Sequence, residues 1–308
     1  MKLALLCNNQ VAFPALQQLR AQGATVHVGA DAANRELLPS LQQYCSDLGF
    51  SFRAFDAGTF DEQLDTWLDD TTPDAVLMMT CPFKIPEQAL NKPKHGFINF
   101  HYGLLPYYRG ANPVFEQMRR REPNGGITVH QVDKGIDTGA VILQQKMPVH
   151  PDETFGMHMG RLSALGAEMV RSLTAMMASG NSLPNAPQDE MKACYYRRPG
   201  ADDVRIKWDD MQAEDIVALA NACNPWNYGA GTQLNGNMLG VSAAAVLKDT
   251  APANTRPGTI LSIDPEQGLR VAATGQKVLR LDIIYVNSSF MPGYKLAMFG
   301  IQPGMFFN

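Results

Sequence analysis

Residues 3–7, Leu3-Ala4-Leu5-Leu6-Cys7, form a short apolar run that ends at the polar triplet Asn8-Asn9-Gln10. A run of this length is typical of a strand buried on both faces. Similar runs then alternate with segments of helical period along the chain. The expected strands are 3–7, 25–28, 52–55 and 75–79, and the expected helices are 13–22, 35–48 and 60–69. This alternation predicts a doubly wound α/β fold, in which helices cover both faces of a mostly parallel sheet.

The second half of the chain changes character after one long segment of helical period at 154–179. Further strands are expected at 97–100, 127–132 and 140–145 before that helix. Pro, Asn, Asp and Gly dominate 181–203, which is typical of a linker. One helix at 213–223 and short strands at 239–246, 259–263, 269–272 and 278–286 then predict a small OB-like β barrel. The predicted organisation is a first domain at 1–180, a linker at 181–203 and a barrel domain at 204–308.

Composition limits the class of protein. With 308 residues, 45% of them hydrophobic and 18% charged, the chain is long and apolar enough for two folded domains. The net charge of −4 argues against general binding of polyanions. Residues 204–308 carry four Lys and four Arg against six Asp and two Glu, so the net negative charge belongs to the first 203 residues.

The cysteines and apolar segments bear on location. Five cysteines are scattered without a Cys-x-x-Cys pair, which favours a reducing, cytoplasmic compartment over a disulfide framework or a zinc site. The apolar start imitates a secretory signal, but Asn8 interrupts it early. No run reaches the roughly 18 apolar residues of a membrane helix, so no membrane association is expected.

The densest group of polar residues follows the strand at 97–100, in the stretch Gly96–Gly110. Asn99 and His101 are two residues apart and therefore project from the same face of that strand. Ligands of doubly wound sheets bind beyond the carboxyl ends of the strands, which is where this pair lies. The chain has neither the G-x-G-x-x-G of dinucleotide sites nor a P-loop, so dehydrogenase and P-loop kinase functions lose support.

A second polar group, Asp133–Gly139, joins two expected strands and would lie near the same edge of the sheet if they form a hairpin. Asp and Gly are also common in ordinary turns. From the residues alone, Asp137 is either a site residue or a turn residue.

These segments resemble the formyltransferase family that uses 10-formyltetrahydrofolate. The resemblance lies in the Asn-x-His strand end at Asn99 and His101, Leu104-Leu105-Pro106, Arg109-Gly110 and Asp137-Thr138-Gly139. In the second domain it extends to Ile206-Lys207-Trp208, Asn224-Pro225-Trp226 and 256–260.

The resemblance implies that an amine attacks the formyl carbon of the folate, through a tetrahedral intermediate. Asn99 and a protonated His101 would donate hydrogen bonds to the developing oxyanion, and Asp137 would hold the imidazole and help to relay the proton. The implied folate contacts, made largely by backbone groups, are Cys81, Phe83, Lys84, Ile85, Pro86, Asp133 and Ile136. The implied acceptor contacts are Tyr102, Tyr108 and Arg109, and no metal is expected.

The acceptor is inferred from charge. The early region 29–51 has Arg35 as its only basic residue, whereas family members that act on tRNA resemble one another in a basic loop there. We therefore expect a small-molecule amine, such as a nucleotide-linked amino sugar, with methionyl-tRNA as the alternative and less expected acceptor. A non-catalytic α/β ligand-binding protein is a more remote alternative.

Overall fold

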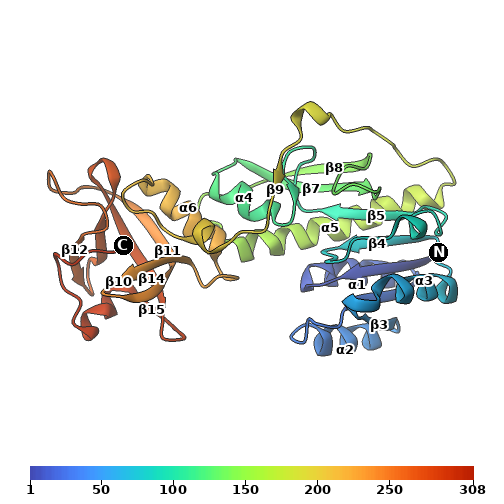
Figure 1. Ribbon diagram of the computed structural model, residues 1–308, viewed down its shortest axis with the longest axis horizontal. Helices are drawn as coiled ribbons and strands as arrows, with labels where there is room; N and C mark the ends of the chain where they lie inside the picture. Colours follow the sequence, from blue (N-terminus) through green and yellow to red (C-terminus); the bar gives the residue numbers. More distant parts are fainter. The chain divides into compact units, whose positions relative to one another are not determined.

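The computed structural model describes residues 1–308, whose contacts divide the chain into two compact units (Figure 1). Unit 1 comprises residues 1–113, 125–148 and 159–196. Unit 2 comprises residues 114–124, 149–158 and 197–308. Two short segments from the first half of the chain therefore group with the C-terminal residues. The domain limits expected from the sequence, 1–180 and 204–308, stay a prediction.

Unit 1 contains a seven-stranded sheet with the order β3-β2-β1-β4-β5-β7-β8. Its strands are β1 (Lys2–Cys7), β2 (Thr25–Asp31), β3 (Ser51–Phe55), β4 (Ala75–Met79), β5 (Phe97–His101), β7 (Asn124–Gln131) and β8 (Val141–Pro148). Neighbouring strands from β3 to β5 are parallel, and β7 is antiparallel to β5. All five residues of β4 are buried, as expected for a parallel strand covered on both faces.

Helices cover both faces of this sheet. The helices of the region are α1 (Phe13–Ala21), α2 (Leu38–Leu48), α3 (Phe60–Thr71) and α5 (Phe155–Ala178). The α3 residues Phe60, Leu64, Trp67 and Leu68 share an apolar cluster with Met78. Gly166 of α5 instead faces the next residue, Met79, whose methyl carbon would lie 3.1 Å from a Cβ at that glycine. Because successive strand residues point to opposite faces, α3 and α5 lie on opposite sides, and the doubly wound prediction is confirmed.

A two-stranded parallel pair sits apart from the large sheet. It joins β6 (Arg109–Gly110) to β9 (Tyr195–Tyr196), so residues expected to form a linker pair with the loop after β5. The short helix α4 (Pro113–Arg119) follows β6 directly. The predicted linker is thus structured over part of its length.

Unit 2 contains a six-stranded antiparallel sheet and the helix α6 (Ala213–Cys223). Its strands are β10 (Ala230–Leu234), β11 (Asn237–Thr250), β12 (Ile260–Asp264), β13 (Gly268–Ala272), β14 (Lys277–Val286) and β15 (Ser289–Pro292). The order β10-β11-β14-β13-β12 leaves β10 and β12 as edges, with β15 paired to β14. The expected C-terminal β domain is confirmed as an antiparallel sheet, and β10 and β15 are strands that the sequence did not indicate.

The barrel expected here is not closed by direct pairing of its two edge strands. Residues 304–308 lie along both edges instead. The N–H of Ile260 donates to the carbonyl of Met305 (2.8 Å), and the N–H of Asn308 donates to the carbonyl of Gln233 (2.8 Å). The C-terminal segment therefore satisfies backbone groups that an open sheet would expose.

Three chain-wide features complete the description. All five cysteines are free. None of the helices combines the length and the apolar character needed to cross a bilayer. No group of three or more His, Cys, Asp or Glu side chains is arranged to hold a metal ion.

Candidate active site

The candidate site begins where β5 pairs with β7. Asn99 lies opposite His130 in this antiparallel pair, and His101 lies opposite Thr128. Directly opposed residues share a face of the sheet and lie close together. The register therefore adds His130 and Thr128 to the pair that the sequence singled out.

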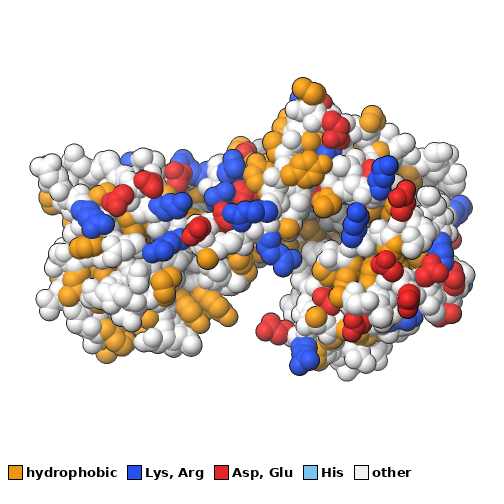
Figure 2. All heavy atoms as spheres, viewed as in Figure 1, with side chains coloured by type: hydrophobic (Ala, Val, Ile, Leu, Met, Phe, Trp, Pro, Cys, Tyr) orange, Lys and Arg blue, Asp and Glu red, His pale blue; other side chains and the backbone are white.

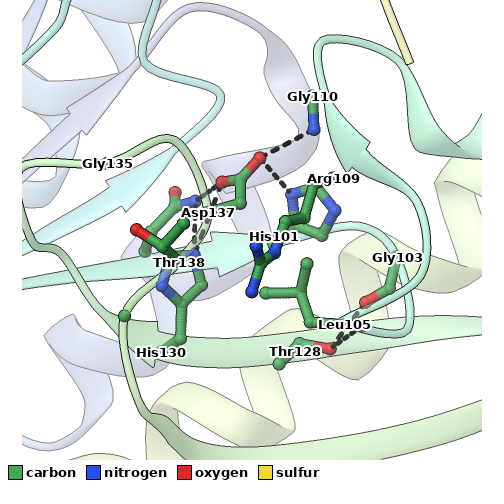
Figure 3. Close-up of polar contacts among 12 residues, drawn as sticks. His101, Gly103, Leu105, Arg109, Gly110, Thr128, His130, Gly135, Asp137 and Thr138 are labelled. Atoms are coloured by element: carbon green, nitrogen blue, oxygen red, sulfur yellow. Dashed lines mark hydrogen bonds and ion pairs between the residues drawn. The ribbon is translucent and has the colours of Figure 1, made fainter. Parts of the chain in front are cut away.

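Asp137 lies between the two imidazoles (Figure 3). Its Oδ2 is 3.5 Å from His101 Nδ1 and accepts the backbone N–H of Gly110 at 2.9 Å, while its Oδ1 is 3.5 Å from His130 Nε2. Burial alone would raise the pKa of Asp137, but the His130 and His101 side chains and the Gly110 N–H lower it to about 2. Asp137 therefore carries a charge at neutral pH and contacts both imidazoles, and its role as a site residue stays a prediction.

His101 is buried, with only 5% of its surface exposed. Its Nε2 lies 2.8 Å from the carbonyl oxygen of Tyr108, and because a carbonyl only accepts, Nε2 carries the proton. Burial lowers the pKa of His101, and the opposing effect of Asp137 does not outweigh it. A neutral imidazole is therefore favoured, which differs from the expected protonated His101.

The amide of Asn99 is oriented by two acceptors. His130 Nδ1 lies 2.8 Å from the carbonyl of Gln131 and donates to it, so in the neutral ring Nε2 is an acceptor. Asn99 Nδ2 is 3.1 Å from this Nε2 and donates to Asp137 Oδ1 at 3.4 Å. Both N–H bonds of Asn99 face protein groups, and its Oδ1 has no protein partner. This differs from the expected donation of the Asn99 amide to an oxyanion.

The loop after His101 is held close to the imidazole. A Cβ at Gly103 would lie 2.9 Å from His101 Nε2, so only glycine fits there without displacing the ring. Thr128 donates its hydroxyl to the Gly103 carbonyl (2.6 Å) and accepts the Leu105 N–H (3.1 Å), and Gln144 Nε2 donates to the Leu105 carbonyl (2.8 Å). The β7 and β8 strands thus fix the loop that carries Tyr108.

Most of the residues expected to contact the acceptor are buried within unit 1. Tyr102 is 6% exposed, and its hydroxyl has no protein partner. The ring of Tyr108 stacks on Tyr196, with centroids 5.3 Å apart. Arg109 is fully buried and directs all of its N–H groups to Gln188, Glu190 and Tyr195. The Arg109 side chain therefore links segments of unit 1 to one another and has no N–H group left for a substrate.

The expected folate contacts fall on two loops that pack against one apolar cluster. Cys81 and Phe83 pack against it from one loop, and Val132, directly before Asp133, from the other. Phe83 stacks on Phe60 with centroids 4.1 Å apart, Ile85 is buried, and burial raises the pKa of Cys81 to about 12. Lys84 is exposed, Pro86 is half-buried, and Ile136 is 63% exposed. Asp133 Oδ1 accepts from the Gly135 N–H and the Thr138 hydroxyl, so it shapes its own turn.

Sequence reasoning missed His130, Thr128 and Gln188. The first two alternate along β7, but only the register to β5 reveals that they face Asn99 and His101. Gln188 is separated from Asp137 by 51 residues and lies in a segment of linker composition. No local signal in the sequence indicates it.

A mixed doubly wound sheet with a half-buried Asp137 beside the buried His101 at the end of β5 is an arrangement typical of α/β enzymes. Residues 9–173 match the formyl transferase family model, and residues 200–293 match the model of the formyl transferase C-terminal domain. The chain belongs to the formyl transferase family, whose members are enzymes that transfer formyl groups.

Two sequence relatives are methionyl-tRNA formyltransferases. The one from Syntrophus aciditrophicus (strain SB) is 32% identical over 238 residues, covering 75% of this chain and 74% of the relative. The one from Pseudomonas syringae pv. tomato (strain ATCC BAA-871 / DC3000) is 35% identical over 209 residues, covering 68% and 64%. The expectation that tRNA is the less suitable acceptor finds no support in these relatives.

Two solved structures share the fold at low identity. HypX from Aquifex aeolicus in complex with tetrahydrofolic acid has a TM-score of 0.71 and 15% identity; the match covers 96% of this chain but only 46% of HypX. The N-formyltransferase from Helicobacter canadensis in complex with folinic acid and dTDP-3-aminofucose has a TM-score of 0.67 and 16% identity, covering 93% and 99%. The acceptor therefore differs among proteins that resemble this chain.

Proposed function

We propose that the protein transfers the formyl group of 10-formyltetrahydrofolate to a primary amine, with Asn99, His101 and Asp137 as its catalytic residues. The observation that carries this proposal is the half-buried Asp137 carboxylate, which lies between two imidazoles and 3.5 Å from His101 Nδ1. A charged carboxylate beside a neutral imidazole is suited to taking up the proton that an attacking amine loses.

The residues present fit a folate donor. Within Cys81–Pro86, the backbone N–H groups have no acceptor inside the protein, so they are available to the polar edge of a pterin. Phe83 and Ile85 supply apolar surface beside them. The folate, when bound, supplies an activated formyl carbon. We assign its contacts to the 81–86 loop and to the turn that carries Asp133 and Ile136.

The protein groups then have separate tasks. His101 Nδ1 accepts a proton, and the Asp137 carboxylate stabilises the imidazolium that results. The Asn99 Oδ1, the atom of this cluster without a protein partner, accepts an N–H of the incoming amine and aligns its lone pair. Gly110 and His130 keep the carboxylate and the amide in place.

A small-molecule amine, such as a nucleotide-linked amino sugar, is the first candidate acceptor. It is supported by the single basic residue within 29–51 and by the zero net charge of 204–308. The Helicobacter canadensis protein, which carries an amino-sugar nucleotide in its solved structure, matches this chain over nearly its whole length.

Methionyl-tRNA is the second candidate and is favoured by the sequence relatives. Unit 2 also carries basic side chains, and Figure 2 shows Lys and Arg gathered with acidic residues over the region where Figure 1 draws α6. Asp203 lies beside both Arg197 and Arg119, so two basic segments meet in this unit. Clustered Lys and Arg attract phosphate backbones, but here Arg119, Arg121 and Arg197 are paired with carboxylates.

One assay tests both the reaction and the acceptor. The protein is supplied with 10-formyltetrahydrofolate and, separately, with amino-sugar nucleotides, amino acids and methionyl-tRNA, while tetrahydrofolate release and the formylated product are measured. We expect turnover with one acceptor class and its loss in His101→Ala. Turnover confined to methionyl-tRNA would exclude the first candidate, and no turnover with any amine would exclude the proposed function. Cytoplasmic location stays a prediction based on the scattered cysteines.

A further inference from the structure

The segment Ala186–Tyr196, here called the strap, is anchored to unit 1 at both ends. Ala186 and Val141 exchange two backbone hydrogen bonds of 2.8 and 3.0 Å at the start of β8. At the other end, the Arg109 N–H donates to the Cys194 carbonyl (2.9 Å), and β9 pairs with β6. A segment with linker composition is thus part of the structure around the candidate site.

Side chains of the strap enclose Arg109. Glu190 binds its guanidinium through both carboxylate oxygens, at 2.9 and 2.7 Å, and Tyr195 accepts a further N–H at 2.7 Å. Gln188 Oε1 accepts from Arg109 Nε and Nη2 at 3.1 and 2.8 Å. A two-pronged ion pair of this kind fixes both position and orientation. Arg109 therefore holds the strap, and the strap holds Arg109.

Gln188 also links Arg109 to the Asp133–Gly139 turn. Its Nε2 donates to the carbonyl oxygens of Asp137 (2.8 Å) and Gly139 (2.7 Å). Both ends of the Gln188 amide are thus satisfied, one by Arg109 and the other by the turn. The two bonds grip the backbone of the residue whose carboxylate faces His101.

The two residues that hold His101 have unusual backbone conformations. Asp137 and Tyr108 both have φ near +55°, in the left-handed region that residues with a Cβ rarely adopt. Such conformations persist only where the surroundings impose them. Gln188 bonds the Asp137 carbonyl, and Tyr196 stacks on the Tyr108 ring, so the strap touches both.

We propose that Gln188 is a positioning residue for formyl transfer, and that the strap holds the Asp137 carboxylate at its working distance from His101. The proposal rests on the proposed function. Gln188 acts through the backbone of Asp137 and does not touch the reacting atoms.

The test compares two substitutions at one position with a control on the same segment. Gln188→Met removes both ends of the amide. Gln188→Glu keeps an acceptor for Arg109 but sets an oxygen against the carbonyls of Asp137 and Gly139. Lys192→Gln is the control, since Lys192 pairs only with Asp189 and both side chains are about half-exposed or more.

We expect kcat to fall roughly 10- to 100-fold in both Gln188 variants, because small displacements of a catalytic group cost rates of this size. The KM for 10-formyltetrahydrofolate should stay within about twofold, and Lys192→Gln should match the parent. Unchanged kcat in Gln188→Glu, or a fall matched only by loss of thermal stability with the pH profile unmoved, would overturn the proposal.

A second readout does not need activity. The titration of His101 is followed by NMR of the folded protein, with His101→Asn to identify its signal. Asp137 raises the His101 pKa, while His130 and Arg109, the other charged or titratable neighbours, lower it. A displaced Asp137 should therefore move the His101 midpoint to lower pH in Gln188→Met, which adds no charge of its own. An unmoved midpoint would overturn the positioning role even if the parent proves to have no formyl-transfer activity.

Discussion

The Asp133–Gly139 turn and the Cys81–Pro86 loop are both expected to border the formyl donor, yet they are built in opposite ways. In the turn, Asp133 bonds Gly135 and Thr138, and Gln188 caps the carbonyls of Asp137 and Gly139. In the loop, the backbone N–H groups bond nothing within the protein, and only the Cys81 thiol approaches the Phe83 carbonyl, at 3.7 Å. The turn is therefore held by bonds within the protein, whereas the loop has backbone N–H groups that the proposed donor could satisfy.

The largest effect is expected in the Asp133–Gly139 turn, from the substitution Asp137→Asn. The substitution removes the charge that stabilises a protonated His101, so kcat/KM should fall about 10²- to 10⁴-fold, the usual contribution of acid–base catalysis. Steady-state kinetics with the identified acceptor measures this. Asp152→Asn is the matched control, because it makes the same substitution at an exposed side chain outside the site. Retention of more than a tenth of the activity in Asp137→Asn would contradict the assignment.

The pH profile tests the state of His101. Burial lowers the pKa of His101 from its usual value, so the neutral, proton-accepting form predominates at neutrality. We expect kcat/KM to rise with pH below about 6.5 and to stay level from 7 to 8.5. The pKa of Asp137, about 2, is too low to add a limb in this range. A decline between pH 6 and 8 would show that the protonated imidazole is the active form.

The same shifts predict how acid affects folding. The pKa values of His101 and Asp137 are both lower in the folded state than in the unfolded state. Each group therefore contributes its full stability above its unfolded-state pKa, and this stability is lost as pH falls. The first loss accompanies protonation of His101 below pH 6.5, and the second occurs as Asp137 is protonated between pH 3.8 and about 2. Urea unfolding at a series of pH values measures this, and stability that rises on acidification from pH 7 to 5 would contradict it.

A smaller effect is expected from substitutions of His130, which lies in the same group of side chains as Asp137. His130→Leu removes the acceptor that orients the Asn99 amide, and we expect kcat to fall about tenfold, the equivalent of one hydrogen bond of about 1.4 kcal/mol. His130→Gln places an amide oxygen within reach of Asn99 and should recover most of the rate. Equal losses in the two variants would argue against an orienting role.

The smallest effect is expected from the exposed side chains of the two loops that are expected to border the donor. Lys84 and Ile136 have exposed side chains, and the loop offers its backbone, so Lys84→Ala and Ile136→Ala should change the KM for 10-formyltetrahydrofolate by no more than about twofold. A tenfold increase in either variant would show that side chains, and not the backbone, recognise the donor.

The sequence predicts what depends on local pattern. The apolar runs at 75–79 and 213–223 match β4 and α6 residue for residue, and Asn99 and His101 follow from period-two spacing at a strand end. The features that the sequence did not predict depend on strand register and on contacts between residues far apart in the chain. His130 meets Asn99 only through the pairing of β5 with β7, and Arg109 is buried by Glu190, 81 residues away. Residues 181–203 have the composition of a linker, yet part of the segment is ordered by bonds to residues far away in the chain.

The strap has a consequence for biosynthesis. Asn99, His101 and Asp137 are all translated by residue 137, but Gln188, whose amide bonds the Asp137 carbonyl, is translated 51 residues later. A nascent chain that ends before Ala186 contains these three side chains and all the strands of the seven-stranded sheet, yet lacks the Gln188 amide that bonds the turn. If the proposed roles hold, the catalytic arrangement is completed late in synthesis, after the sheet that carries it has been made.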